Sequence, residues 1–396
     1  MQELLPPTAV KQLQACNKIE VLEGDITLEN FGLATEVLER LRDDVSIYIH
    51  SAASLNLKSG LPKMASVVIH PSLAAARMAL SFKHLERFVF VSTAYVNAFL
   101  HWQVAEDERV QDCIVEERIY PLHKTDSDIG SAHAELKNIV DFGTTPEYTC
   151  LSHPYAYAYA KHLTERLLLD VFRAAGREHD LLLFRPSCFG PAEKEPVKHF
   201  EVPGSAPLTT VICALAATTP GKHRCKTNLA DPSKTTLDEV PVDVVVNRLV
   251  AHTAFKSHGC VHAVSGASHR RGAMQLVEAM FKLRGWWWLP PVLTWCDQNT
   301  GEEKLSLTFQ LCRVFGCSYI FQQQKTEQIW QLMDDQAKQK WPLWTQRDPA
   351  DVSDIPRRGL MARSMLTGWF KRKYGRAGQW FAMLAFPEPQ VGKPTK

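Results

Sequence analysis

The sequence predicts an α/β fold: a doubly wound, Rossmann-like parallel sheet followed by a mainly helical C-terminal region. Short β-rich runs alternate with helical patterns over roughly the first 270 of the 396 residues. Such alternation is typical of strand–helix–strand units, which build a parallel sheet with helices on both faces. Tryptophan is concentrated in the rest of the chain: nine of the ten tryptophans lie after residue 285. We therefore expect two parts, residues 1–275 and residues 276–396.

Apolar runs and helical spacing locate the individual elements. Strands are predicted over residues 18–22, 45–50, 88–91 and 181–185. Helices are predicted over residues 31–41, 64–80 and 162–175, and in the second part over 305–315, 326–340 and 360–374. Pro71 is expected to interrupt or kink the second of these helices, since proline lacks the N–H that a helix needs.

Composition excludes several classes of protein. Forty-five Lys and Arg against 43 Asp and Glu give a formal charge of +2, too balanced for a dedicated nucleic-acid binder. No apolar run reaches the roughly 18 to 20 residues that span a bilayer, and the N-terminus lacks a secretory pattern. Ten dilute cysteines and 15 scattered histidines predict reduced thiols and no metal site. We expect an intracellular protein, cytoplasmic or peripheral on the endoplasmic reticulum or peroxisome.

Two hydroxyl residues, Ser92 and Thr93, directly follow the predicted strand 88–91. In doubly wound folds the carboxyl ends of the strands open onto the ligand crevice. Hydroxyl groups there can donate to a substrate oxygen. The alternative is ordinary turn chemistry, for which Ser and Thr are also suited.

Tyr157 and Lys161 stand four residues apart where a predicted helix begins, so they share one helix face. An ammonium near a phenol favours the phenolate and lowers its pKa from about 10. That environment suits Tyr157 to donate a proton to a developing alkoxide. The alternative is an amphipathic core edge with a solvated lysine, because Tyr-x-x-x-Lys also recurs by chance.

The order of these segments is more specific than any one of them. Strand–Ser-Thr, then Tyr-x-x-x-Lys, then strand–Arg-Pro at 184–187 resembles the extended short-chain dehydrogenase/reductases. Further motifs resemble the fatty acyl-CoA reductases, the male-sterility-protein family, from about residue 18 to about residue 280. They are Glu-Gly-Asp-Ile at 23–26, Ile-His-Ser-Ala-Ala at 49–53, Val-Ser-Thr-Ala-Tyr-Val-Asn at 91–97, Arg-Pro-Ser at 185–187, Lys-Glu-Pro at 194–196 and the Val-Pro-Val-Asp segment at 240–247.

The resemblance implies an NADPH-dependent reductase of long-chain fatty acyl-CoA, giving aldehyde and usually alcohol. Residues 1–275 would be its NAD(P)-binding reductase domain. The implied catalytic residues are Tyr157 as acid, Lys161 as ribose ligand, and Thr93 or Ser92 as donors to the acyl carbonyl. The implied cofactor-binding residues are Asp25 and Ile26 by the adenine, Ala52 and Ala53 along the dinucleotide, and Lys161, Pro186 and Ser187. Donors aimed at the oxygen would stabilise its developing charge.

One family element is missing. The glycine-rich turn should place pyrophosphate on a helix N-terminus, yet Gly24 is the first glycine. The fold is therefore expected to lack its first strand–helix unit, to expose a sheet edge and to bind NADPH weakly or not at all. A truncated start, a silent paralogue acting as a binding protein, or completion by another chain would each account for this. A thioester reductase domain and a sugar-nucleotide epimerase are the related enzyme alternatives.

The stretch 356–376 contains seven Lys and Arg residues and no acid. Met361, Met365 and Trp369 recur every fourth residue along it, which predicts a basic amphipathic helix. Such a helix could contact an anionic membrane surface peripherally. The alternative is a helix that packs on its own domain with a solvated basic face. The run Trp286, Trp287 and Trp288 is expected to pack in a core rather than to anchor at a membrane.

Overall fold

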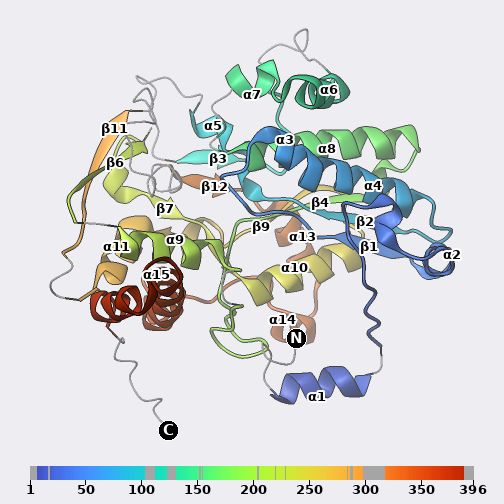
Figure 1. Ribbon diagram of the computed structural model, residues 1–396. Helices are drawn as coiled ribbons and strands as arrows, with labels where there is room; N and C mark the ends of the chain where they lie inside the picture. The colour runs from blue at the N-terminus through green and yellow to red at the C-terminus, as the bar shows by residue number, and fades with distance from the viewer. Residues whose placement is uncertain are drawn as a thin grey trace.

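A four-stranded parallel sheet forms the centre of the molecule (Figure 1). The computed structural model describes residues 7–16, 18–102, 112–122, 131–150, 153, 155–202, 205–218, 220–227, 229–282, 284–285, 289–297 and 317–387. The strands, in their order across the sheet, are β1 (Ile47–His50), β2 (Arg87–Val91), β4 (Leu181–Pro186) and β9 (Gly259–Ala263). All pair in parallel. The predicted doubly wound parallel fold is confirmed.

Helices cover both faces of this sheet. On one face α4 (His70–Leu80) and α8 (Ala156–Ala174) pack on Phe88 and Phe90 of β2. On the other face α10 (Val242–Ala254) packs on Val89, the residue between them. Successive strand residues point to opposite faces, so the apolar run of β2 supplies both cores.

The crossovers between the strands do not all have the same hand. The connections from β1 to β2 and from β2 to β4 pass over the face of α4 and α8, whereas that from β4 to β9 passes over the face of α10 (Figure 1). Each step moves the same way across the sheet, so the last crossover has the opposite hand to the first two. About 98% of such crossovers are right-handed. Either the first two crossovers or the last one is therefore a rare left-handed connection.

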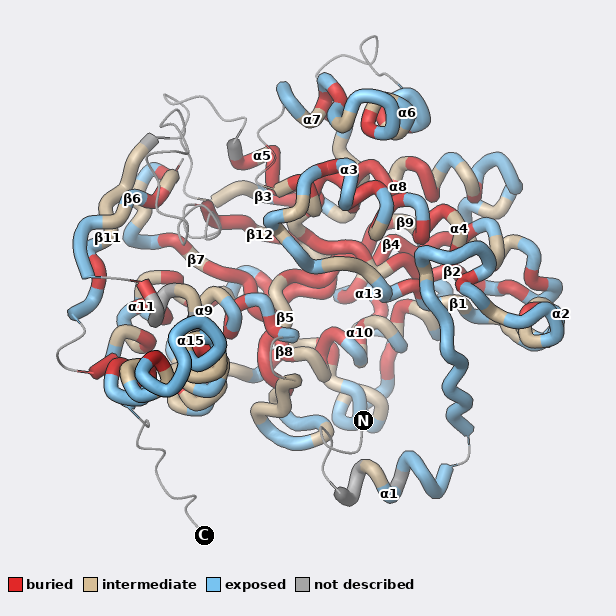
Figure 2. The backbone as a smooth tube through the Cα atoms, viewed as in Figure 1, coloured by how far each residue is buried: buried red, intermediate tan, exposed pale blue. Residues whose placement is uncertain are grey.

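The two edges of the sheet differ. On β1, Ile47 and Ile49 are 47% and 46% exposed, and among the described residues this strand pairs with β2 alone (Figure 2). The unpaired edge expected from the sequence is therefore present in the described chain. The outer edge of β9 is instead covered by side chains. Lys325 Nζ donates to the carbonyl of Cys260 at 3.0 Å, and Glu117 Oε1 accepts the N–H of His262 at 2.8 Å.

Four two-stranded sheets tie distant segments together. They pair β3 (Cys113–Val115) with β12 (Tyr319–Phe321), β5 (Cys188–Gly190) with β8 (Glu239–Pro241), β6 (Lys222–Thr227) with β11 (Val292–Asp297), and β7 (Thr236–Leu237) with β10 (Arg271–Gly272). Two of these pairs cross residue 275, because β11 and β12 lie in the second part. Neither strand was predicted, and the division at residue 275 stays a prediction.

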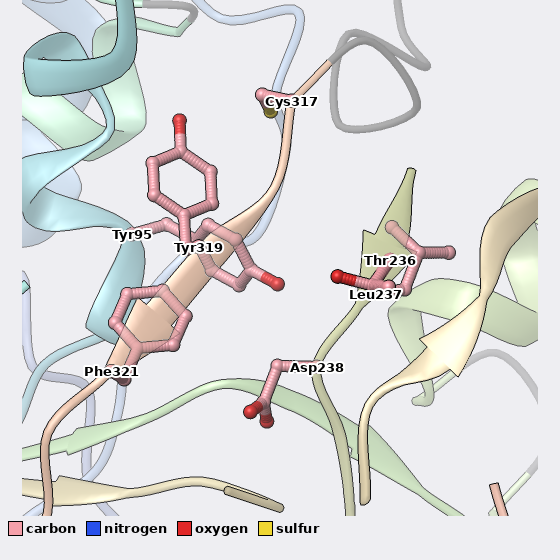
Figure 3. A pocket seen from close by; sticks show the side chains of 7 residues that line it. All are labelled: Tyr95, Thr236, Leu237, Asp238, Cys317, Tyr319 and Phe321. Carbon is pink, nitrogen blue, oxygen red and sulfur yellow. The ribbon is translucent and has the colours of Figure 1, made fainter. Parts of the chain in front are cut away.

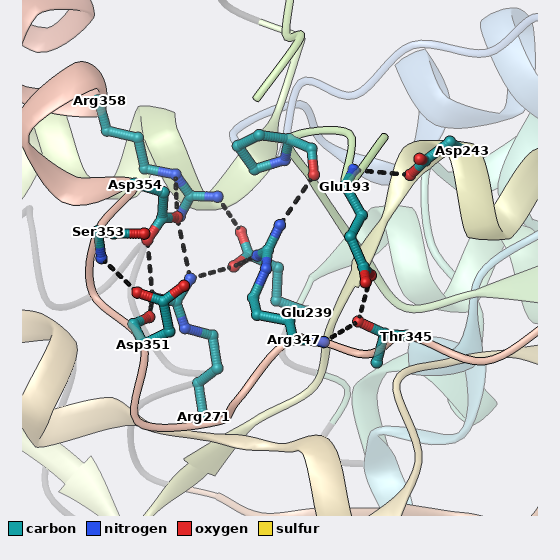
Figure 4. A network of polar contacts seen from close by, with 11 residues as sticks. Glu193, Glu239, Asp243, Arg271, Thr345, Arg347, Asp351, Ser353, Asp354 and Arg358 are labelled. Atoms are coloured by element: carbon teal, nitrogen blue, oxygen red, sulfur yellow. Dashed lines mark hydrogen bonds and ion pairs between the residues drawn. The ribbon is translucent and has the colours of Figure 1, made fainter. Parts of the chain in front are cut away.

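A buried ionic network also joins the two parts (Figure 4). Glu239 at the start of β8 accepts from Arg271 at 2.8 Å and from Arg358 at 2.5 Å. Asp354 pairs with the same two arginines at 2.9 and 3.1 Å. All four side chains are at most 4% exposed. Such groups remain charged in the interior only because each charge has an opposite partner.

The remaining helices surround this frame. They are α1 (Pro7–Cys16), α2 (Thr35–Asp44), α3 (Leu61–Met64), α5 (Phe99–Trp102), α6 (Ala132–Phe142), α7 (Pro146–Cys150), α9 (Pro207–Ala217), α11 (Ala273–Phe281), α13 (Gln324–Leu332), α14 (Asp335–Lys340) and α15 (Ile355–Ala385). None of the described helices combines the length and the apolar content that crossing a bilayer requires.

Two N-terminal predictions were wrong in part. Residues 18–22 form no strand and are exposed, since no strand lies beside them among the described residues. α2 begins at Thr35 instead of Phe31 because Asn30 and Phe31 adopt left-handed φ angles of 47° and 58°, which end a right-handed helix. Pro71 does interrupt its helix as predicted: a π-helical turn at Ala65–Ile69 precedes α4.

The C-terminal helices also differ in detail. The predicted helix 326–340 is split into α13 and α14, because Met333 is extended and Asp334 Oδ1 caps α14 by accepting the N–H of Ala337 at 2.7 Å. The predicted helix 360–374 lies inside α15, whose two halves turn at Gly375 (φ 64°). They pack through Phe370 and Phe381, with ring centroids 5.4 Å apart. The predicted helix 305–315 and Trp286 to Trp288 lie outside the described residues.

Candidate functional site

The carboxyl end of β2 presents the two predicted hydroxyl residues. Ser92 continues the ladder, its N–H donating to Phe184 O at 2.7 Å. Thr93 Oγ1 accepts the N–H of Tyr95 at 3.3 Å and so caps the short 3₁₀ turn Ala94–Asn97. The Ser92 side chain is buried, and its hydroxyl has no hydrogen-bond partner among the described residues. A buried hydroxyl without a partner costs free energy unless a ligand supplies one.

Helix α8 begins beside this turn and carries Tyr157 and Lys161. Tyr155 is extended and marks the N-terminal boundary of the helix. Three alanines follow at alternate positions, Ala156, Ala158 and Ala160, all of them buried. Their small side chains and high helix propensity let the first turns of α8 lie close to the sheet. Tyr157 is thereby placed inside the helix, five residues before the predicted start at residue 162.

Lys161 reaches the end of β2. Its Nζ donates to the carbonyl of Val91 at 2.8 Å and lies 4.4 Å from the ring centroid of Phe90. The side chain is 2% exposed, and burial lowers the pKa of Lys161 to about 7, although the carboxylate of Glu165 opposes this shift. The solvated-lysine alternative is therefore wrong, and the ammonium lies next to the backbone of Ser92.

Tyr157 is half-buried, and the pKa of its phenol is shifted in the opposite direction to that expected. Burial, with a smaller contribution from the thiol of Cys188, raises the pKa of Tyr157 above its usual range. The expectation that Lys161 lowers this pKa is not met, because the Lys161 Nζ is directed to the Val91 carbonyl. Tyr157 remains protonated at neutral pH, the state that a proton donor needs.

The segment after β4 supplies the third side of the site. Ser187 Oγ donates to Asp238 Oδ1 at 2.5 Å, and the same carboxylate accepts the N–H of Ser265 at 2.8 Å. The thiol of Cys188 lies 3.8 Å from the hydroxyl of Tyr95. Through Cys188 the segment therefore contacts both the turn after β2 and the face of Tyr157.

A small hollow lies behind this contact (Figure 3). It is lined by Tyr95, Thr236, Leu237, Asp238, Cys317, Tyr319 and Phe321. Tyr95 packs edge-on against Tyr319 and Phe321, with ring centroids 5.8 and 5.5 Å apart. The aromatic residues of β12 thus hold the turn that follows Thr93.

The residues predicted to bind the cofactor differ in their burial and in the elements that carry them. Pro186 ends β4 opposite Ala263. Ala53 is partly buried against the core that Tyr157 also contacts, while its neighbour Ala52 is exposed. Ile26 packs against that core.

Asp25, the chain neighbour of Ile26, lies in an exposed turn. Its carboxylate accepts the N–H and the hydroxyl of Thr27 at 2.8 and 2.7 Å, and these bonds lower the pKa of Asp25.

Sequence reasoning gave no role to His50 or Asp238. His50 Nε2 lies 3.1 Å from Ser72 Oγ, and burial together with the charge of Lys161 lowers the pKa of His50 to about 4. His50 stood inside the quoted Ile-His-Ser-Ala-Ala motif, which could have drawn attention to it. Asp238 precedes the Val-Pro-Val-Asp segment by two residues and lies outside every quoted motif.

The residues fit one half of a nicotinamide dinucleotide. The free Ser92 hydroxyl and the buried Lys161 ammonium, which has one carbonyl acceptor, suit the ribose and nicotinamide end. The glycine-rich turn that would hold the pyrophosphate end is not found among the described residues, in which Gly24 is the first glycine. Within the described chain, no group of His, Cys, Asp and Glu could hold a metal ion.

Comparison with known proteins gives the family. Residues 2–249 match the family model described as male sterility protein, an NAD-binding domain. The chain belongs to this family, the fatty acyl-CoA reductases of the extended short-chain dehydrogenase/reductases. The male-sterility-protein family resemblance seen in the sequence is thereby confirmed, and with it an oxidoreductase family that uses a nicotinamide cofactor.

Relatives with curated names agree with this assignment. The chain is 28% identical over 240 residues to the putative fatty acyl-CoA reductase CG8306 of Drosophila melanogaster, covering 60% of this chain and 42% of that protein. It is 26% identical over 255 residues to fatty acyl-CoA reductase 2 of Homo sapiens, covering 63% and 45%. The chain therefore spans less than half the length of these relatives.

Solved structures with a similar fold include DesIV, a dTDP-glucose 4,6-dehydratase from Streptomyces venezuelae. It is 12% identical with a TM-score of 0.49, covering 92% of this chain and 85% of that chain. The terminal R domain of the myxalamid pathway is 14% identical with a TM-score of 0.48, covering 90% and 76%.

Proposed function

We propose that this protein takes part in the NADPH-dependent reduction of long-chain fatty acyl-CoA to the aldehyde or alcohol. The observation that carries the proposal is the contact of Lys161 Nζ with Val91 O at 2.8 Å. It brings the helix of Tyr157 against the strand end that bears Ser92 and Thr93. A donor phenol, a buried ammonium and two hydroxyls then share one end of the sheet, as acyl reduction requires.

Each residue has a distinct role in this proposal. The cofactor, when bound, supplies hydride to the carbonyl carbon of the thioester. Ser92 and Thr93 donate hydrogen bonds to the carbonyl oxygen as it gains negative charge. Tyr157 would transfer its proton to that oxygen, and the C–S bond of the resulting hemithioacetal would then break, so that coenzyme A leaves as the thiol with the hydroxyl proton and the aldehyde is released. Lys161 would bind the ribose hydroxyls of the cofactor. Ser187, fixed by Asp238, and Pro186 would help to hold the nicotinamide. The name shared by the curated relatives supports fatty acyl-CoA as the substrate.

The test is NADPH oxidation with palmitoyl-CoA, measured for the wild type and Tyr157→Phe. Removing a general acid typically lowers turnover about 10²–10⁴-fold. Tyr159→Phe is the control, because that phenol donates to Glu135 at 2.5 Å on the other side of the same helix. Equal turnover by the wild type and Tyr157→Phe would remove Tyr157 from the mechanism.

A second candidate function is a binding protein without catalysis. The specific observation in its favour is that the described residues contain no glycine-rich turn for the pyrophosphate of the cofactor. Isothermal titration with NADPH separates the two. We expect weak or no binding by these 396 residues, and a micromolar affinity would contradict that expectation. Titration of a chain extended upstream of Met1 tests whether a glycine-rich turn restores binding.

We also propose peripheral contact with an anionic membrane through the stretch 356–376, in the first half of α15. Exposed Trp369 stands there beside exposed Lys371, Arg372 and Lys373, a combination typical of interfacial helices. Flotation with phosphatidylserine vesicles is expected to carry the wild type. The charge reversals Lys371→Glu and Arg372→Glu should abolish flotation, and persistence of it would contradict the proposal.

A further inference from the structure

His50 is a buried histidine at the same end of the sheet as the reactive hydroxyls. It is the last residue of β1, is 4% exposed, and pairs in register with Phe90 of β2. The loop that follows it begins with the exposed residues Ser51 and Ala52. β1 and β2 lie side by side on the sheet that α4 and α8 cover (Figure 1). His50 therefore lies at the carboxyl end of the strands, where doubly wound folds hold their ligands.

A chain of hydrogen bonds fixes which nitrogen of His50 carries the proton. The hydroxyl of Ser72 donates to the carbonyl of Val68 at 2.6 Å, so its single proton is engaged there. The contact of 3.1 Å between Ser72 Oγ and His50 Nε2 is then a bond that Nε2 donates. In a neutral imidazole this leaves Nδ1 as an unprotonated acceptor.

The Nδ1 atom of His50 has no hydrogen-bond donor among the described residues. Unlike the Nδ1 atoms of His153 and His162, it also keeps contact with the surface. Burial and the charge of Lys161 lower the pKa of His50 to about 4, so the imidazole is uncharged at neutral pH. An acceptor nitrogen is thus available to a ligand that brings a hydroxyl or an N–H.

The ring of Phe90 connects His50 with Lys161. The imidazole stacks on this ring, with centroids 6.0 Å apart and 16° between the planes, and Lys161 Nζ lies 4.4 Å from the ring centroid. The ammonium has three N–H donors, of which one is directed to the Val91 carbonyl at 2.8 Å. Free N–H donors and a free acceptor nitrogen therefore border one aromatic ring.

A sugar hydroxyl matches this pair of groups, because it accepts one hydrogen bond and donates another. We infer that His50 is a cofactor-binding residue, whose Nδ1 accepts a hydrogen bond from a ribose hydroxyl of the nicotinamide nucleotide. Lys161 donates to the same ribose. The inference rests on the proposed function, and it adds to the ribose contact of Lys161 a second residue from a different strand.

Reduced nicotinamide mononucleotide is the probe, because it carries the ribose and the nicotinamide without the pyrophosphate, for which the described residues contain no glycine-rich turn. It is titrated at millimolar concentrations into the full chain labelled with ¹⁵N at histidine. Imidazole ¹⁵N resonances report both the tautomer of His50 and a hydrogen bond at Nδ1. We expect the Nε2–H tautomer in the free protein and a shift of the Nδ1 resonance on binding. Free nicotinamide, which has no ribose, should cause no such shift.

His50→Gln tests the acceptor by affinity. Its amide keeps a donor near the position of Nε2 but has no acceptor at the position of Nδ1, so the affinity for the mononucleotide should fall about three- to tenfold. His252→Gln is the matched control. His252 is a buried histidine of α10, on the other face of the sheet, and its two nitrogens each lie 2.9 Å from a hydroxyl, of Ser257 and of Thr326. This variant should bind the mononucleotide as the wild type does.

Three results would overturn the inference. They are no binding of the mononucleotide by the wild type, an unshifted Nδ1 resonance in the bound protein, and equal losses of affinity in His50→Gln and His252→Gln. The resonance is measured in the wild type, so this readout holds even if His50→Gln fails to fold.

The readout is independent of catalysis, since Tyr157→Phe should bind the mononucleotide as the wild type does. If palmitoyl-CoA is reduced but the Nδ1 resonance does not respond, the His50 contact is refuted and the reductase proposal stands. If the mononucleotide shifts the resonance but no turnover is found, the contact stands and the reductase proposal falls.

Discussion

Two regions of this molecule bury cations in opposite ways. In the network of Glu239 and Asp354, the guanidinium groups of Arg271 and Arg358 each face two carboxylates. At the end of β2, Lys161 is equally buried but donates to a backbone carbonyl. The pKa of Arg271 is raised, since hydrogen bonds and charges of Asp354 and Glu239 outweigh burial, whereas burial lowers the pKa of Lys161 to about 7.

This difference distinguishes buried charges that stabilise the fold from a buried charge that is available to bind a ligand. A network in which every charge faces an opposite charge holds segments of the chain together. A buried ammonium with a single neutral acceptor, next to a serine hydroxyl without a partner, is unfavourable in the folded protein until a ligand satisfies both. Substitutions in the two regions should therefore change stability in opposite directions.

The largest effect on stability is expected from Glu239→Gln. Removing this charge leaves Arg271 and Arg358 with Asp354 alone, and breaking a buried ion pair typically costs about 3–5 kcal/mol. The measurement is the free energy of unfolding in urea. Glu116→Gln is the control, since its pair with Arg118 is exposed on both sides and should contribute less than about 1 kcal/mol. Equal losses would contradict a special role for the network.

Lys161→Met should stabilise the fold instead. Because the folded pKa of Lys161 lies near 7 and the unfolded pKa near 10.5, the unfolded chain binds more protons between these values. The wild type therefore gains stability as pH rises through this window. We expect the variant to be more stable by up to about 4 kcal/mol near pH 7, and by about 1 kcal/mol near pH 10. Unfolding at both pH values measures this, and a pH-independent difference would contradict the lowered pKa.

Ser187→Ala and Ser92→Ala compare a paired with an unpaired hydroxyl. Ser187→Ala deprives the buried Asp238 carboxylate of a donor and should cost about 1–3 kcal/mol. Its effect is read from the shift of the urea midpoint at constant slope.

Ser92→Ala is expected to have the smallest effect on stability, within about 0.5 kcal/mol of zero, because its hydroxyl has no hydrogen-bond partner among the described residues. The same variant should lower turnover with palmitoyl-CoA. A destabilisation as large as that of Ser187→Ala would show that Ser92 is engaged in the folded chain.

Much of the fold and site follows from local sequence. The apolar runs of β2 and β4 and the spacing of Tyr157 and Lys161 were sufficient to predict one end of the sheet. Burial and contacts that depend on residues far apart in the sequence could not be predicted in this way. The direction of the Tyr157 pKa depends on how α8 packs, and Asp243 accepts a hydrogen bond from a loop about fifty residues away in sequence. Residues 18–22 had the composition of a strand, but a strand forms only beside a partner.

The contrast between the two sheet edges bears on how this protein behaves in concentrated solution. Lys325 and Glu117 occupy the backbone groups of β9, so that side of the sheet cannot accept a further strand. Among the described residues β1 pairs with β2 alone, and it carries exposed Ile47 and Ile49, so its other edge is a surface on which strands of separate molecules add to one another. Self-association should therefore begin at β1, and a lysine in place of Ile49 is the substitution expected to keep the molecules apart.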